Sequence, residues 1–247
     1  MATTMQRAAM TERGTTSSLI ASDRVEGTAV YDARGKRIGK VERLVIDKAN
    51  GRIAYAVLNF GGFLGIGADH YPIPWPMLDY DDKLDGYRVD ITEEQLKDVP
   101  KIEQGESWEH ANWEEVHTYW EQPAPVQERQ TSILITSDKV EGMPVYDAHG
   151  KRIGKVEGLM IDKLTGRIAY AILSFGGFLG IGKDHYPIPW SMLTYNEKPD
   201  GFQLDVTEEQ LKNAPKIEGG ENWEQTNRDR NQDVYDYWEV RYYWVLD

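Results

Sequence analysis

Apolar and polar residues alternate along several short segments of this chain, and many of the apolar positions are β-branched. Residues 37–46 and 52–58 show the pattern most clearly, and residues 47–51 between them contain the dipeptide Asn-Gly. Alternation with a period of two is typical of a strand with one buried face, and Asn-Gly is a strong signal for a tight turn. These segments therefore predict an antiparallel hairpin.

Further elements follow this hairpin. Residues 70–75 contain two prolines at alternate positions, which predicts an extended edge or bulged strand because proline cannot donate to a ladder. Residues 86–91 predict the closing strand. Thr92 and Gln95 predict a capping box at the start of a short helix that ends at Pro100. Five or six short strands and one helix in roughly 80 residues favour a small antiparallel barrel.

The whole pattern occurs twice, with an offset of 115 residues. Residues 25–108 and 140–223 align without a gap and are identical at 61 of 84 positions. Two copies with so long a period indicate a tandem duplication of one fold rather than a solenoid. The expected organisation is a disordered lead, a first barrel, an acidic helical segment with a Pro-rich linker, a second barrel and an acidic C-terminal segment: 1–17, 18–103, 104–132, 133–218 and 219–247.

The shared motifs resemble those of the PRC-barrel family. They are the Gly-Lys-Arg-Ile-Gly run at 35–39, the FGGFLGIG loop at 60–67 and the Ile-Pro-Trp run at 73–75, in the same order in both copies. The resemblance implies two small mainly β barrels, as in the cytoplasmic domain of the photosynthetic reaction centre H subunit and the C-terminal domain of the ribosome maturation factor RimM. It also implies an adaptor-like role, and similarity to soluble bacterial members suggests a stress-related one.

Composition narrows the function classes. The 247 residues include no cysteine, which excludes disulfides, Cys-ligated metal centres and thiol nucleophiles. The formal net charge is -13, and a negatively charged protein repels the phosphate backbone, so we do not expect direct nucleic-acid binding. We find neither an apolar signal segment nor a stretch long enough to span a membrane, and we expect a cytoplasmic protein.

Most of the negative charge lies outside the repeats. Residues 103–128 contain seven acidic residues and no Lys or Arg, and residues 218–247 contain eight acidic residues and three Arg. Aromatic and apolar residues at helical spacing predict one-sided helices in both segments, and residues 242–245 predict an extended end. Either the aromatic face packs on its own barrel, or it anchors a protein partner or a second copy of the chain. The candidate partner contacts are Trp113, Trp120, Tyr237, Trp238 and Trp244.

The glycine-rich loops are the second candidate site. A phosphate-binding loop should open a helix, whereas here a Pro-containing strand follows, so we expect a turn at a barrel end. The neighbouring histidines lie next to aspartates, and adjacent strand residues point to opposite faces, so we expect structural histidines. A ligand contact is the alternative for Gly62, Phe63, Gly65, His70, Gly177, Phe178, Gly180 and His185.

Each copy also carries a basic turn, at residues 34–40 and 151–155. We expect these charges to protect a solvated hairpin edge from pairing with other chains, and a phosphate or RNA contact is the alternative. With no duplicated catalytic set, we expect a non-enzymatic interaction or scaffold protein without cofactor or metal. Protein partners or a homo-oligomer are its expected partners. The alternatives are a RimM-like role in ribosome or RNA assembly and an H-subunit-like association with a photosynthetic complex.

Overall fold

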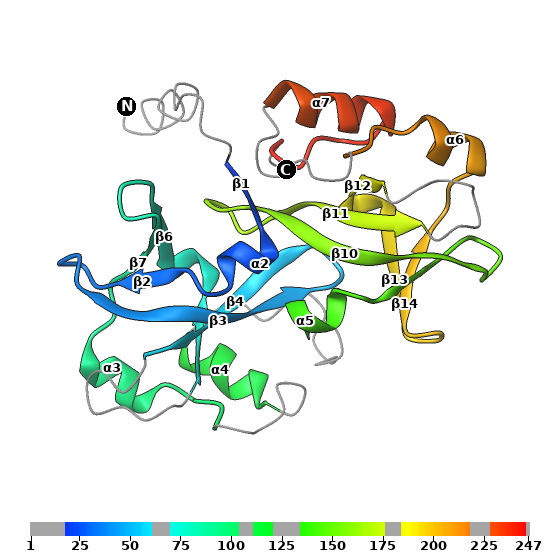
Figure 1. The fold of residues 1–247 in the computed structure, drawn as a ribbon. Helices are drawn as coiled ribbons and strands as arrows, with labels where there is room; N and C mark the ends of the chain where they lie inside the picture. Colours follow the sequence, from blue (N-terminus) through cyan, green and yellow to red (C-terminus); the bar gives the residue numbers. More distant parts are fainter. Residues whose placement is uncertain are drawn as a thin grey trace, which may run out of the picture.

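The computed structural model of the chain describes residues 18–60, 70–103, 111–120, 134–175, 184–217 and 228–245. The architecture is mainly β, with two curled mixed sheets and short helices (Figure 1). The predicted mainly β tandem fold is therefore confirmed. Each half supplies six consecutive strands to its own sheet and one short strand to the other.

The two halves contain matching elements in the same order. The first half comprises β1 (Leu19–Ala21), α2 (Ser22–Val25), β2 (Ala29–Tyr31), β3 (Arg37–Asp47), β4 (Arg52–Asn59), β5 (His70–Pro74), η2 (Trp75–Met77), β6 (Leu78–Asp81), β7 (Gly86–Val89), α3 (Glu93–Asp98) and α4 (Trp113–Tyr119). The second half comprises β8 (Leu134–Thr136), α5 (Ser137–Val140), β9 (Pro144–Tyr146), β10 (Arg152–Asp162), β11 (Ile168–Phe175), β12 (His185–Pro189), η6 (Trp190–Met192), β13 (Leu193–Asn196), β14 (Gly201–Leu204), α6 (Glu208–Asn213) and α7 (Arg228–Tyr237).

The strand order in the first sheet is β5-β4-β3-β2-β7-β6, and the second sheet repeats it. The prolines of β5 lie at the sheet edge, as the sequence predicts, because an edge strand can spare ladder donors. The predicted capping boxes are also present, with Thr92 and Thr207 as the N-caps of α3 and α6. One pairing differs from the antiparallel expectation: β2 pairs with β7 in parallel, and β9 pairs likewise with β14.

The two halves exchange their first strands. β1 pairs with β10 of the second half, with Ile20 opposite Ile161, and β8 pairs with β3 of the first half, with Ile135 opposite Ile46. Neither sheet is therefore built from one repeat alone. One cluster of buried side chains runs through both halves, so the two barrels share a hydrophobic core.

A pair of reciprocal turn contacts also joins the halves. The β3–β4 turn reaches the second half, where a Cβ on Gly51 would lie only 2.2 Å from Trp190 Cδ1. The β10–β11 turn reaches back, where a Cβ on Gly166 would lie 2.4 Å from Trp75 Cδ1. The backbone N–H of Ile53 donates to Gly166 O, and that of Ile168 donates to Gly51 O. Glycine is therefore required both by the turn and by the close approach of the indole.

The outer face of each sheet is covered by a C-terminal helix of the same half. Alternate residues of β4 point to opposite faces, so Ala56 and Leu58 join the shared core while Tyr55 and Val57 pack against α4. In the second half, β11 is covered by α7 in the same way. α4 and α7 consequently lie on opposite outer sides of the molecule (Figure 1).

Candidate functional site

The aromatic residues of α4 lie against their own barrel. Trp113 is 4% exposed and stacks on Tyr55, with ring centroids 5.5 Å apart. Trp120 is half-buried, and its Nε1 donates to the carbonyl of Pro72 at 3.0 Å. The Tyr119 hydroxyl donates to the carbonyl of Gln95 at 2.8 Å and so ties α4 to α3. Of the two arrangements left open by the sequence, the intramolecular one is therefore present in α4.

The C-terminal segment repeats this arrangement. Trp238 is 7% exposed, and Tyr237 donates to the carbonyl of Gln210 at 2.6 Å, as Tyr119 does in the first half. Trp244 is half-buried and stacks on Tyr242, with centroids 4.7 Å apart. The expectation of an extended end at 242–245 is wrong. The chain forms a turn there, in which Val245 N donates to Tyr242 O. The turn brings the aromatic rings of 242–244 over β1 and β11, and burial of these rings favours it over an extended end.

Of the glycine-loop candidates, the structure describes only the two histidines. Gly62, Phe63, Gly65, Gly177, Phe178 and Gly180 lie outside the described residues. His70 and His185 are half-buried and begin β5 and β12. Their backbones bridge to Ile102 and Ile217, so each position closes the sheet onto the chain that follows the short helix. These contacts involve the backbone and not the imidazole rings, so the structural role and the ligand alternative both stay predictions.

A polar cluster at the seam between the halves was missed at the sequence level. Ser22 Oγ donates to Glu141 Oε1 at 2.6 Å and accepts from Leu159 N at 3.2 Å. Ser137 makes the same two contacts, with Glu26 and with Leu44 N. The signal was available, because the Ser-Asp-x-Val-Glu-Gly sequence of 22–27 returns at 137–142. Its pairing across the repeats was not visible from local pattern.

The charges at this seam are unequal. Burial raises the pKa values of Glu26 and Glu141, and their mutual repulsion raises that of Glu26 further. Arg43 opposes this effect: its Nη1 lies 3.1 Å from Glu26 Oε2, and its Nε lies 3.8 Å from Asp138 Oδ1. The equivalent position in the second half is Gly158. One guanidinium therefore serves the acidic groups of both halves.

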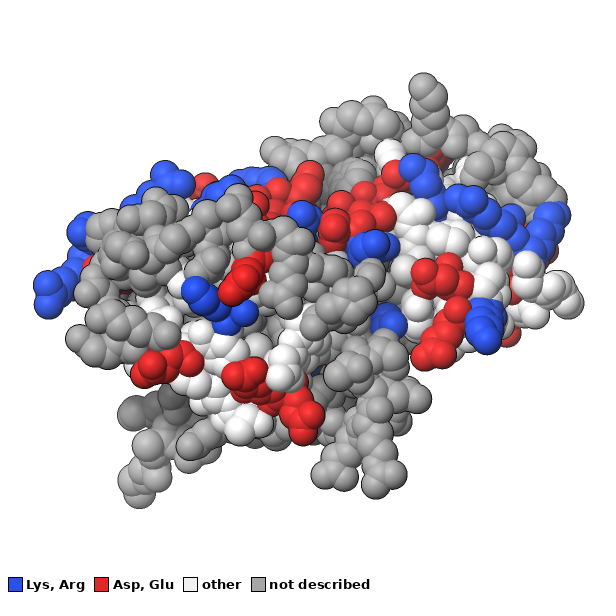
Figure 2. Space-filling view, turned by 90° about the horizontal axis from the view of Figure 1, so that it is seen from below, with Lys and Arg blue, Asp and Glu red and all other residues white. Residues whose placement is uncertain are grey.

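Two basic hairpins lie at opposite ends of the molecule. The turn between β2 and β3 occupies one end and the turn between β9 and β10 the other (Figure 1). Lys and Arg side chains are prominent at both ends of the face shown in Figure 2, with acidic side chains between them. The exposed cations of the two hairpins are Arg34, Lys36, Arg37, Lys40, Lys151, Arg152 and Lys155.

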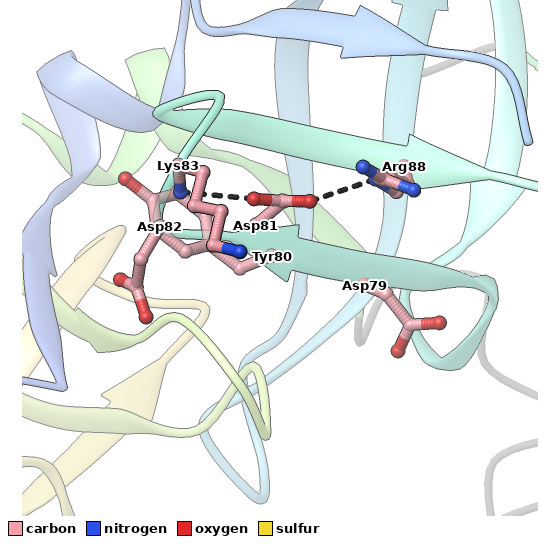
Figure 3. A pocket seen from close by; sticks show the side chains of 6 residues that line it. All are labelled: Asp79, Tyr80, Asp81, Asp82, Lys83 and Arg88. Atoms are coloured by element: carbon pink, nitrogen blue, oxygen red, sulfur yellow. Dashed lines mark hydrogen bonds and ion pairs between the residues drawn. The ribbon is translucent and has the colours of Figure 1, made fainter. Parts of the chain in front are cut away.

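The β6–β7 hairpin borders a shallow hollow of about 400 Å³, lined by Asp79, Tyr80, Asp81, Asp82, Lys83 and Arg88 (Figure 3). Asp81 accepts from the backbone N–H of Lys83, which lowers the pKa of its carboxyl, and pairs with Arg88 Nε at 2.8 Å. In the second half, Asn196 donates to Gln203 at the equivalent positions. A neutral hydrogen-bonded pair thus occupies the place of the ion pair in the second half. What the two halves share at this position is a side-chain contact between neighbouring strands.

The described parts of the chain contain no group of three or more His, Cys, Asp or Glu residues placed to hold a metal ion. Among the same residues, no helix is long and apolar enough to cross a membrane.

These features define a mainly β protein in which two duplicated half-barrels are interlocked. The chain belongs to the PRC-barrel domain family, whose model matches residues 18–96 and 134–211. The two matched segments confirm the resemblance found in the sequence and its tandem arrangement. Comparison with curated proteins found no significant match.

Proposed function

We propose that this tandem PRC-barrel protein is a non-enzymatic interaction or scaffold module that presents two related surfaces to protein partners. The observation that carries the proposal is the reciprocal exchange of β1 and β8, because it holds two copies of one surface in a fixed relation. Two sites on one rigid body raise avidity through effective concentration without new contacts. The resemblance adds a stress-related setting to this proposal.

The experiment must use the full chain, because a single-repeat fragment would lack one strand of its sheet. We would tag the full-length protein, purify it from its native cells at low salt and determine subunit composition by native mass spectrometry. The proposal expects a partner protein bound as two copies per chain. Recovery of the chain alone, or with a single partner copy at saturation, would contradict it.

A role in ribosome or RNA assembly is the second candidate, and the basic hairpins are the observation that favours it. The acidic balance of the whole chain opposes contact with bare RNA, so a basic ribosomal protein is the contact that this candidate requires. Co-sedimentation with ribosomal subunits at low salt would support the second candidate. If the protein does not co-sediment with ribosomal subunits, the role in ribosome or RNA assembly is ruled out.

A further inference from the structure

The two basic hairpins have the same sequence framework and the same shape. Residues 35–42 are identical to residues 150–157, and the cations at 36, 37 and 40 match those at 151, 152 and 155. All six of these side chains are exposed. The chain thus carries one cationic surface twice, on a body whose total charge is -13.

Both hairpin tips are held by local hydrogen bonds. Asp32 Oδ1 accepts from the backbone N–H groups of Arg34 and Lys36, at 2.9 and 2.8 Å. Asp147 Oδ1 accepts from the equivalent groups of His149 and Lys151, both at 2.9 Å. The glycine in each tip has a positive φ, of 79° and 77°. The cations therefore project from a preorganised turn, which lowers the ordering cost of binding.

The basic hairpins are formed by strands that lie inside the sheet order. β2 lies between β3 and β7, and β3 lies between β2 and β4, with the exchanged β8 alongside its far end. The strands that carry the basic hairpins are therefore interior in the sheet order. Arg37 nevertheless pairs only with Tyr31, and β4 pairs with β3 from Lys40 onward, so protection of the tip from edge pairing stays a prediction. The edges are formed by β5 and β6, of which β5 carries the two prolines.

Each hairpin contains one ion pair whose lysine side chain is exposed. Lys40 pairs with Glu42 at 2.8 Å and Lys155 with Glu157 at 3.0 Å, and both lysine side chains are 47% exposed. The exposed ammonium groups of Lys40 and Lys155 can accept a further carboxylate beside Glu42 and Glu157, while Arg37 and Arg152 supply planar donors for a second carboxylate.

We propose that the two hairpins are twin docking sites for an acidic protein segment, a proposal that rests on the interaction function above and names its partner. A continuous phosphate polymer extends beyond one hairpin, towards the acidic side chains that lie between the two basic ends in Figure 2, and like charges there oppose its binding. A short peptide with a few Asp or Glu residues contacts the hairpin alone. The acidic peptide is therefore the favoured occupant.

The test uses the full-length chain and a fluorescent peptide with the sequence of residues 103–122, which contains six Glu and no Lys or Arg. Binding is followed by fluorescence anisotropy at low salt, and folding of each variant by circular dichroism. The test variant combines Arg37→Glu and Arg152→Glu, one change in each hairpin. The matched control combines Lys83→Glu and Lys198→Glu, which are exposed equivalents in the β6–β7 and β13–β14 turns and change the net charge equally.

We expect wild-type protein to bind two peptides, and the hairpin variant to lose at least about tenfold in affinity. Arg37→Glu alone should leave one site, and the control should bind as wild type does. Absence of binding to wild-type protein, or equal losses in control and hairpin variants, would overturn the proposal. If a short single-stranded RNA bound more tightly than the peptide, the proposed occupant would be wrong and the hairpins would be assigned to nucleic acid. A native partner found at two copies per chain, and insensitive to the hairpin variant, would remove this inference while leaving the proposed function.

Discussion

The contact between each turn and the opposite indole gives a sharp prediction for Gly51→Ala. Gly51 has φ +65°, and an added Cβ would lie 2.2 Å from Trp190 Cδ1, well inside any real contact. Trp190 is only 5% exposed, so it has little space in which to retreat. The substitution therefore strains its own backbone and forces the seam apart.

The control is Gly35→Ala. Gly35 has a similar φ of +79°, and a Cβ there would meet nothing within 4 Å. Alanine in the left-handed region costs roughly 1–2 kcal/mol, and both variants share this cost and the gain from a stiffer unfolded chain. Gly51→Ala also overpacks a filled site, which costs roughly a further 1–3 kcal/mol. We expect the free energy of unfolding to fall by roughly 2–5 kcal/mol for Gly51→Ala and by roughly 1–2 kcal/mol for Gly35→Ala.

Urea unfolding followed by circular dichroism measures both changes. Gly166→Ala, with Gly150→Ala as its control, should give the same contrast against Trp75. If Gly51→Ala and Gly35→Ala lower the free energy of unfolding equally, the interlocked seam described above would be refuted.

Three further predictions follow from the seam and the covering helices. Glu26→Gln with Glu141→Gln should raise the melting temperature at pH 7 and leave it unchanged near pH 4, because a raised folded-state pKa contributes stability below the unfolded pKa and loses it as pH rises through the folded pKa. An unchanged or lower melting temperature at pH 7 would contradict this. Ser137→Ala should cost about 1–3 kcal/mol in a urea titration, because it removes a buried hydroxyl that joins Glu26 to Leu44 N; a cost near zero would show that the bridge is dispensable. Trp113→Ala should cost about 3–5 kcal/mol in the same titration, and a loss below 1 kcal/mol, or about that, would mean that α4 is not packed on the barrel.

Local pattern was enough to predict most of the elements. The alternation at 37–46 and 52–58, the two prolines of 70–75 and the Thr92–Gln95 capping box all appear in the structure where the sequence placed them. Each of these signals depends on residues a few positions apart. The duplication then fixed the second copy, because a near-identical sequence adopts the same fold.

Long-range pairing could not be predicted in this way. The parallel contact of β2 with β7 and the exchange of β1 with β8 join residues far apart in sequence, and an alternating pattern does not specify which strand will pair with which. The aromatic helices were predicted, but only packing against Tyr55 and Tyr170 settled which surface their rings cover.

The strand exchange has a consequence for the order of synthesis. The sheet of the first half is finished only when residues 134–136 have left the ribosome, and β1 meets its partner only once residues 152–162 have emerged. At ordinary translation rates the wait lasts on the order of ten seconds. Throughout that interval β3 has an open side and β1 has no ladder, so the nascent first half carries an exposed edge. An exposed strand edge can pair with other chains, so the interval before the seam closes is the stage of synthesis at which aggregation is favoured.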